Sequence, residues 1–269
     1  MKKFSCKLIA LTLALALLSL FAAGCSNEKP GNFSDEMKIP HGADLSPADG
    51  ADSVERDGDH SDSPYFKHPD FYNMESTNTL TILKNFKTLQ QTSEWSCGVA
   101  TAAMVLEWYG KLGDNDELTL SKFRKPSEYS ERLPGRSEPS ATSLRQMIDM
   151  FEAIGGFDIY STFDCVDNAE DIFTFGFIQE TLKQGNPIMI GWNDWGGHWQ
   201  AIIGYDTMGT DEEGDDVIIV ADPYDTTDHN QDGYVIYGAE RILYNFTFYD
   251  FFPDEELNDM VFLVAKPQQ

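Results

Sequence analysis

Basic residues and cysteines are both scarce in this chain of 269 residues, and each shortage removes a class of function. Lysine and arginine number 19 against 45 aspartates and glutamates, so the formal net charge is −26 at pH 7. Phosphate backbones repel a chain this acidic, and we expect no nucleic-acid partner. Four cysteines are too few for a disulfide framework, and the lack of clustered Cys and His excludes a structural zinc site.

Only one long apolar run occurs, and it lies at the N-terminus. A short basic start precedes an apolar stretch that ends in Ala22-Ala23-Gly24, immediately before Cys25. This pattern over residues 1–24 is typical of a signal peptide. The small residues before the cysteine resemble the lipobox of bacterial lipoproteins, which implies a lipid on Cys25. The alternative is plain secretion with an incidental cysteine. We therefore expect an extracytoplasmic protein that is anchored to a membrane through Cys25.

Composition divides the exported part of the chain into two regions. Residues 25–64 are rich in Asp, Ser, Gly and Pro and contain few large apolar residues. Such a segment cannot bury enough surface to offset the entropy of ordering, so we expect a disordered acidic tether. Residues 65–269 are rich in aromatic and aliphatic side chains throughout, and about 205 residues suffice for one substantial core. We expect a single folded domain there.

Helical patterns come first in this domain, and strand patterns follow. Apolar residues at helical spacing predict three helices, at 97–111, 140–154 and 168–184. Gly, Asp and Asn turns then separate five β-rich runs, at 187–192, 198–205, 216–222, 233–238 and 260–266. This order predicts an α+β fold in which N-terminal helices pack on an antiparallel sheet.

Cys97 opens the first predicted helix and is the nucleophile candidate. Free backbone N–H groups and the positive end of the dipole stabilise a thiolate at a helix N-terminus. The adjacent Gly98 leaves room for a substrate backbone. Gln91, six residues earlier, can turn its side-chain amide toward the same point and hold an oxyanion together with the Cys97 N–H. The sequence leaves open whether Cys97 and Cys165 form a disulfide, and such a bond would exclude catalysis.

A thiol nucleophile also needs a base, and His198 is best placed to supply it. It begins a predicted strand, directly after Gly197, whereas His229 lies in a turn-rich segment. Asp222 ends the next predicted strand. In an antiparallel pair the end of the second strand lies beside the start of the first, so Asp222 can accept from the His198 ring and fix its tautomer. Each residue alone is typical of ordinary packing, but the ordered set predicts a triad.

Aromatic residues surround these positions in the sequence. Trp95 precedes the nucleophile by two residues, and Trp199 directly follows the base. Large aromatic side chains at a cleft edge serve core packing and substrate contact equally well. We assign substrate binding to four residues, which are Trp95, Gly98, Gly197 and Trp199.

These motifs together resemble a known peptidase family. The segments Gln91-x5-Cys97-Gly98, Gly197-His198-Trp199 and Asp222-Pro223 are similar to papain-like peptidases of the bacteriocin-leader type, cysteine peptidase family thirty-nine, and its free-standing relatives. The resemblance implies a papain-like fold with Cys97 as nucleophile, His198 as general base, Asp222 as its orienting carboxylate and Gln91 as oxyanion donor. The leader peptidases are joined to membrane exporters, a part not seen in this sequence, so the chemistry carries over better than the substrate.

A short acidic stretch offers one candidate metal site. Asp228, Asn230 and Asp232 alternate and are followed by Gly233, which suits the first half of a calcium loop. The twelfth position is Ala239 rather than the usual Glu, so a plain turn into the following strand is the alternative. We expect no required cofactor, with a structural Ca²⁺ ion as an option.

The expected function is hydrolysis of peptide bonds in peptide or protein substrates, through the Cys-His-Asp triad and an acyl-enzyme. Two alternatives stay open. An acyltransferase or transpeptidase would use the same site and pass the acyl group to an amine. A non-catalytic lipoprotein would hold peptides in the same cleft.

Overall fold

The structure, a computed structural model, describes residues 35–46, 49–53, 69–125, 141–226, 231–248 and 252–268. The predicted signal peptide and Cys25 lie outside these residues. Among the described residues, no helix is both long enough and apolar enough to cross a membrane. The lipid anchor therefore stays a prediction.

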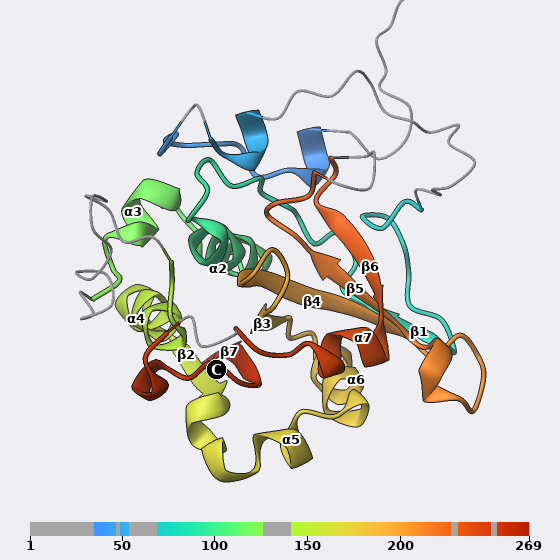
Figure 1. Ribbon diagram of the computed structural model, residues 1–269. Coiled ribbons are helices and arrows are strands. Elements are labelled where there is room, and N and C mark those ends of the chain that lie inside the picture. Colours follow the sequence, from blue (N-terminus) through green and yellow to red (C-terminus); the bar gives the residue numbers. More distant parts are fainter. Residues whose placement is uncertain are drawn as a thin grey trace, which may run out of the picture. The chain divides into compact units, whose positions relative to one another are not determined.

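Seven strands of the described chain form one sheet, and every strand pair in it is antiparallel (Figure 1). The predicted α+β fold class is thereby confirmed. The order across the sheet is β2 (Phe157–Ser161), β7 (Val261–Pro267), β3 (Ile188–Trp192), β4 (His198–Asp206), β5 (Val217–Ala221) and β6 (Tyr234–Gly238), while β1 (Leu80–Ile82) also pairs with β4.

β4 is the central strand, and the active-site candidates depend on its position. Eight of its nine residues are buried, which explains its nearly continuous apolar sequence. The five predicted strands correspond to β3–β7 with ends shifted by no more than about one residue, as is usual for strand boundaries. The sequence interpretation missed β1 and β2, because β1 has only three residues and β2 carries Asp158.

The helices of the described chain depart from the predicted ranges in two informative ways. The first, α2, ends at Trp108 rather than at 111, because Gly110 adopts a φ of 63°, a left-handed conformation that stops a helix. The third predicted helix is two helices, because the Thr174 hydroxyl accepts a hydrogen bond from the Phe177 N–H and caps a new one. The helices are α2 (Cys97–Trp108), α3 (Glu117–Ser121), α4 (Leu144–Ile154), α5 (Ala169–Ile172), α6 (Phe175–Lys183) and α7 (Ala239–Tyr244). Single 3₁₀ turns are η1 (Asp35–Met37), η2 (Ala51–Ser53), η3 (Thr162–Asp164), η4 (Val166–Asn168), η5 (Glu213–Asp215) and η6 (Asp254–Glu256).

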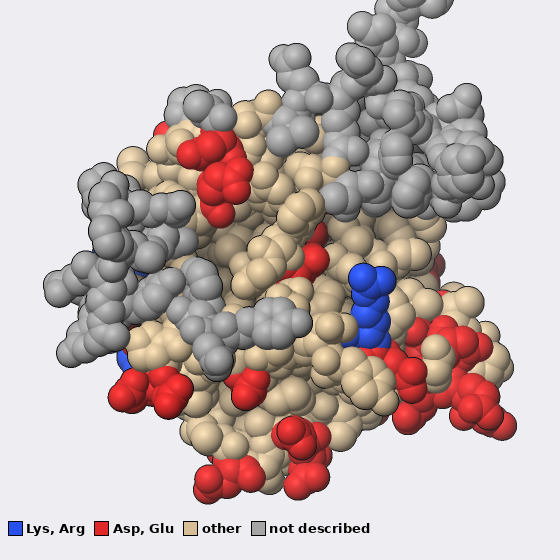
Figure 2. Space-filling view, viewed as in Figure 1, with Lys and Arg blue, Asp and Glu red and all other residues tan. Residues whose placement is uncertain are grey.

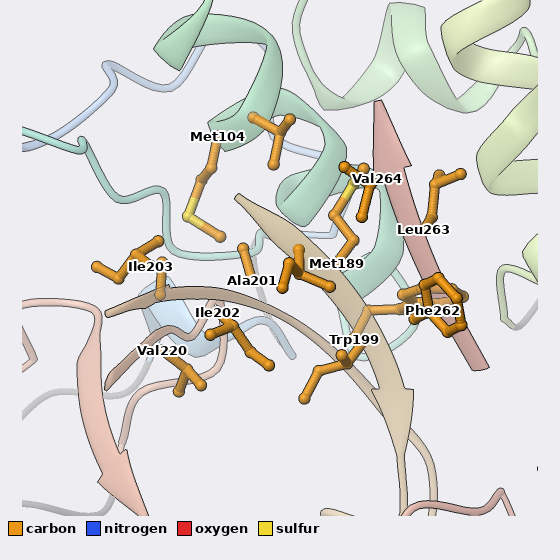
Figure 3. Packing of buried hydrophobic residues seen from close by; sticks show 14 of the residues in the cluster. Met104, Met189, Trp199, Ala201, Ile202, Ile203, Val220, Phe262, Leu263 and Val264 are labelled. Carbon is orange, nitrogen blue, oxygen red and sulfur yellow. The ribbon is translucent and has the colours of Figure 1, made fainter. Parts of the chain in front are cut away.

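Aromatic contacts place helices on both faces of the sheet. Phe157 of β2 meets Phe151 of α4 edge to face, with ring centroids 5.3 Å apart. Tyr160, three positions further along β2, lies against Phe177 of α6 at 6.3 Å. Because successive strand side chains alternate between faces, α4 and α6 cover opposite faces. α2 packs against both α4 and β4, and Met104 extends from α2 toward the strands (Figure 3).

Part of the segment predicted to be a disordered tether packs against the domain. Residues 35–46 and 49–53 run along the loop that precedes α2 (blue in Figure 1). The Ile39 N–H donates to the Thr88 carbonyl at 2.8 Å, and the Thr88 N–H donates to Met37 at 3.0 Å. Met37 and Ala51 are 1% and 0% exposed. These few apolar residues suffice because backbone hydrogen bonds to the domain supply the rest of the binding.

Acidic side chains are spread over the face of the molecule drawn in Figure 2, and basic surface is sparse there. This is the distribution expected from the net charge of −26. Like charges spread over a surface in this way keep a protein soluble and weaken its attraction to other anions.

Candidate active site

Cys97 is the first residue of α2, as predicted. The first hydrogen bond within this helix runs from the Ala100 N–H to the Ser96 carbonyl at 2.9 Å. The backbone N–H groups of Cys97, Gly98 and Val99 therefore precede the helical ladder and are free of intrahelical partners. Cys97 is 9% exposed, and it lines a pocket. The sulfur thus lies at the positive end of a buried helix, where negative charge is stabilised.

The disulfide that the sequence left open is not formed. Cys97 and Cys165 are both free thiols, and the Cys165 sulfur instead approaches the Ser161 carbonyl at 3.8 Å. The sulfur that a nucleophile needs is therefore available.

His198 and Asp222 meet as the strand topology predicts. His198 is the first residue of β4, and Asp222 directly follows β5, its antiparallel neighbour. The distance between His198 Nε2 and Asp222 Oδ1 is 2.6 Å, and both side chains are buried. Because Nε2 is bound to the carboxylate, Nδ1 is the ring nitrogen left to exchange a proton with a substrate or a thiol.

The surroundings of His198 favour its charged form. Burial disfavours the imidazolium and lowers its pKa, but the Asp222 charge and hydrogen bond act in the opposite direction. The Cys97 side chain adds to this effect, and the pKa of His198 is raised to about 10. The ring is therefore protonated at neutral pH and carries a positive charge near Cys97.

Two further hydrogen bonds hold Asp222 in place, and the sequence interpretation missed the more important donor, Gln200. The Gln200 amide nitrogen donates to Asp222 Oδ2 at 2.8 Å, and the Tyr224 N–H donates to Oδ1 at 2.7 Å. The Gln200 amide oxygen accepts from the Trp192 indole N–H at 2.7 Å. Gln200 stands two positions after His198, so the period of two along a strand was the available signal.

Gln91, the predicted oxyanion donor, is buried in the loop before α2. Its backbone N–H donates to the Pro223 carbonyl at 2.9 Å, which joins this loop to the residue after Asp222. Its side-chain nitrogen donates to the Ser93 carbonyl at 2.7 Å. An amide nitrogen carries two hydrogens, so one remains for an oxyanion.

The pocket over Cys97 has a volume of about 190 Å³ and a largely aromatic wall. Trp95, Gly197 and Trp199, which were predicted to bind substrate, all line it. The Trp199 indole N–H donates to the Thr142 carbonyl at 2.6 Å, so its ring is held in place. The remaining lining residues are Glu94, Ala141, Thr142, Trp195, Gly196, Phe248 and Phe252.

Two glycines near the site are explained by packing. A Cβ at Gly98 would lie 2.7 Å from the Thr142 Cβ, so the space predicted for substrate is filled by Thr142. A Cβ at Gly191 would lie 2.1 Å from the Phe248 ring. Gly98 thus lets the start of α4 approach α2, and Gly191 makes room for the aromatic wall.

The predicted calcium loop is only partly described. Asp228 and Asn230 lie outside the described residues. Asp232 is buried, and its Oδ1 accepts from the Tyr234 N–H at 2.9 Å. Within the described residues, no group of three or more His, Cys, Asp or Glu side chains is arranged to hold a metal ion. Calcium binding stays a prediction.

A larger pocket of about 490 Å³ lies away from the triad candidates. Residues 162–171 and 254–260 contribute its lining, and none of the predicted site residues is among them. The predicted site residues thus line the smaller of these two pockets.

Comparisons with known proteins identify the family to which the chain belongs. The sequence profile of the Peptidase_C39 like family matches residues 83–243, which is more than half of the chain. None of the curated proteins compared with the chain matches it. Thirteen chains of solved structures match. One, a crystal structure of a candidate C39-like peptidase from Bacillus anthracis, is 14% identical, covers 71% of this chain and all of its own, and has a TM-score of 0.47. The chain therefore belongs to the Peptidase_C39 like family, and its helices and antiparallel sheet form a papain-like α+β fold.

Proposed function

We propose that this protein is a cysteine peptidase or amidase that hydrolyses peptide bonds with Cys97 as nucleophile, His198 as general base and Asp222 as orienting carboxylate. One observation carries the proposal: the buried 2.6 Å bond between His198 Nε2 and Asp222 Oδ1, beside a free thiol at a helix N-terminus. Membership of a peptidase-like family supports the same class of reaction.

The first chemical step is attack by sulfur. Before the attack the proton of the Cys97–His198 pair resides on His198, whose charged form Asp222 stabilises. The thiolate then forms a bond to the carbonyl carbon, and the carbonyl oxygen becomes an oxyanion. The Cys97 N–H and the second Gln91 amide hydrogen supply the two donors that this oxyanion needs.

The second half of the reaction releases the acyl group and regenerates the sulfur nucleophile. His198 gives its proton to the leaving amine as the C–N bond breaks, which leaves a thioester on Cys97. His198 then takes a proton from water while the water oxygen attacks the thioester. The C–S bond breaks, the carboxylic acid leaves, and the proton taken from water stays on His198 beside the freed thiolate.

The reactivity of the two described thiols tests this proposal without knowledge of the substrate. At pH 6 we expect iodoacetamide to alkylate Cys97 at least about tenfold faster than Cys165, because a neighbouring imidazolium favours the thiolate. Mass spectrometry of peptides from the treated protein measures both rates. Equal and slow labelling of the two cysteines would contradict the proposal and favour the non-catalytic binding protein.

Hydrolysis and acyl transfer differ in their acceptor. Incubation with a diverse peptide library in the presence of an added amine separates them, because a transferase yields amide products whereas a peptidase yields free acids. We expect free acids. A majority of amide products would replace the hydrolase with a transferase on the same site.

We also propose that the protein is exported and anchored through a lipid on Cys25. The apolar run and the small residues before Cys25 support this location. Expression of a Cys25→Ala variant in a bacterial host is expected to move the protein from the membrane fraction to the soluble one. A variant that stays with the membrane to the same extent as the native chain would exclude the lipid anchor.

A further inference from the structure

We propose that Gln200 is a positioning residue of the active site, which fixes the plane of the Asp222 carboxylate and thereby the orientation of His198. The inference rests on the proposed triad and goes beyond it by adding a member that acts through Asp222. Its basis is a chain of hydrogen bonds in which Trp192 donates to Gln200 and Gln200 donates to Asp222, the carboxylate that also accepts from His198.

Gln200 is fully buried, and both ends of its amide are bound. It is 0% exposed and is the third residue of β4. Its oxygen accepts from Trp192 Nε1 at 2.7 Å, and its nitrogen donates to Asp222 Oδ2 at 2.8 Å. A buried amide without such partners would destabilise the fold, so the side chain is held by its contacts.

Trp192 determines which way the amide faces. The indole nitrogen is a donor only, so the Gln200 oxygen must face Trp192. The Gln200 nitrogen must then face Asp222, where it meets a carboxylate that only accepts. Trp192 is itself held, since its ring packs edge to face on Tyr237 with centroids 5.1 Å apart. The donor-only indole thus orients the amide, and the amide orients the carboxylate.

The carboxylate needs this second restraint. Asp222 Oδ1 already accepts two hydrogen bonds, from His198 and from the Tyr224 N–H. Both bonds meet the same oxygen, so they leave the carboxyl group able to turn about its own axis. The bond from Gln200 to Oδ2 removes this freedom and adds a donor that stabilises the negative charge.

Other titratable groups adjoin the same network. The Gln200 nitrogen is also 3.3 Å from Asp194 Oδ2 and 3.4 Å from the Tyr237 hydroxyl. The Tyr237 hydroxyl donates to Asp194 Oδ2 at 2.8 Å. Burial, together with the charges of Asp222 and Asp194, raises the pKa of Tyr237, so this hydroxyl keeps its proton. Gln200 therefore separates two carboxylates, and both accept from its single NH₂ group.

Two variants of the full-length chain test the proposal. Gln200→Met keeps the approximate size but removes both hydrogen bonds, and Gln200→Glu keeps an acceptor for Trp192 but faces Asp222 with a carboxylate. Asn186→Leu is the matched control, because Asn186 is a buried amide that accepts from the Tyr109 hydroxyl just past the opposite end of α2. Each protein is alkylated with iodoacetamide across a range of pH, and the Cys97 adduct is followed by mass spectrometry.

For Gln200→Met we expect the acid-side midpoint of Cys97 alkylation to rise by about half to one pH unit, since a less constrained Asp222 stabilises the imidazolium less well. On a cleaved peptide, kcat/KM should fall about tenfold, with the loss in kcat rather than in KM. Gln200→Glu should be active only toward low pH, where its protonated carboxyl group can still donate. Asn186→Leu should keep both the native midpoint and the native kcat.

A purely structural role gives a different result. It would lower the melting temperature of both Gln200 variants but leave the alkylation midpoint and kcat at the level of Asn186→Leu, and this outcome would overturn the proposal. Alkylation needs no peptide turnover. It therefore tests the role of Gln200 independently of the proposed peptidase activity. A shifted midpoint of Cys97 alkylation without any peptide hydrolysis would contradict the proposed peptidase activity but would support the positioning role of Gln200.

Discussion

Replacement of Cys97 by alanine is expected to lower the rate of peptide hydrolysis by roughly 10⁴-fold or more, to the background level. Without the sulfur no acyl-enzyme forms, and the remaining groups act only on bound substrate. The fold should survive, because alanine fits a position of 9% exposure at the start of a buried helix. Peptide turnover, measured beside a circular dichroism spectrum, checks the result.

Cys165→Ala is the matched control for this prediction. It removes the other thiol of the described chain, which follows η3 and approaches the Ser161 carbonyl. We expect it to retain native turnover. A Cys97→Ala protein that keeps more than about a tenth of native activity would remove Cys97 from the nucleophile role.

Gln91→Ala separates stabilisation of the oxyanion from activation of the sulfur. The variant should keep the native rate of Cys97 alkylation, because alkylation forms no oxyanion. Its kcat should fall by about 10²- to 10³-fold, the usual effect of losing one oxyanion donor. An unchanged kcat would mean that the Gln91 amide serves the loop, where it donates to Ser93, and not the reaction.

The second large effect is expected at the base and its carboxylate. His198→Ala removes the group that accepts and returns the proton, so turnover should fall by roughly 10⁴-fold or more. Asp222→Asn keeps the size of the side chain but no longer supplies a charged acceptor to Nε2. It favours the wrong tautomer and should cost about 10²- to 10⁴-fold. Steady-state kinetics on the same peptide rank the two variants, and near-native turnover by His198→Ala would exclude it as the base.

The free energy of unfolding of the native protein should depend on pH because His198 and Asp222 form a pair. The pKa of His198 lies at about 10 in the folded protein, above the ordinary 6.5 of an unfolded histidine. The stabilisation that His198 contributes is therefore complete below pH 6.5 and is lost as the pH rises toward 10. Urea unfolding at several pH values should show this decline in the native chain and a weaker decline in His198→Ala. The same decline in both proteins would mean that groups other than His198 cause the pH dependence of stability.

Local sequence predicted the elements that carry strong local signals. The five strands after Gly185 appear where their β-rich runs stand, and α2 begins at the cysteine as expected. The errors arose where a single residue overrides a longer pattern. Gly110 ends α2 early, and the Thr174 cap divides the third predicted helix. A helical period averages over such residues, whereas hydrogen bonding depends on each of them.

The segment before the domain shows the limit of composition as evidence. Residues 35–53 look too polar to fold, and alone they have few apolar residues to bury. Met37 nevertheless is buried, because Thr88 offers the segment a backbone to pair with. Composition measures the surface that a segment can bury, but it does not reveal the partner that another part of the chain supplies.

The sequence by itself determined the order of the chemical groups, the α+β class and the meeting of His198 with Asp222, because antiparallel neighbours bring a strand end beside a strand start. Only the tertiary structure decided what surrounds that pair. Thr142 occupies the space beside Gly98, and the Gln91 amide is bound to Ser93. Gln200 lies against Asp222, and Trp192 lies against Gln200. Local patterns specify which residues share a strand face, whereas side-chain packing between distant segments decides which of them touch.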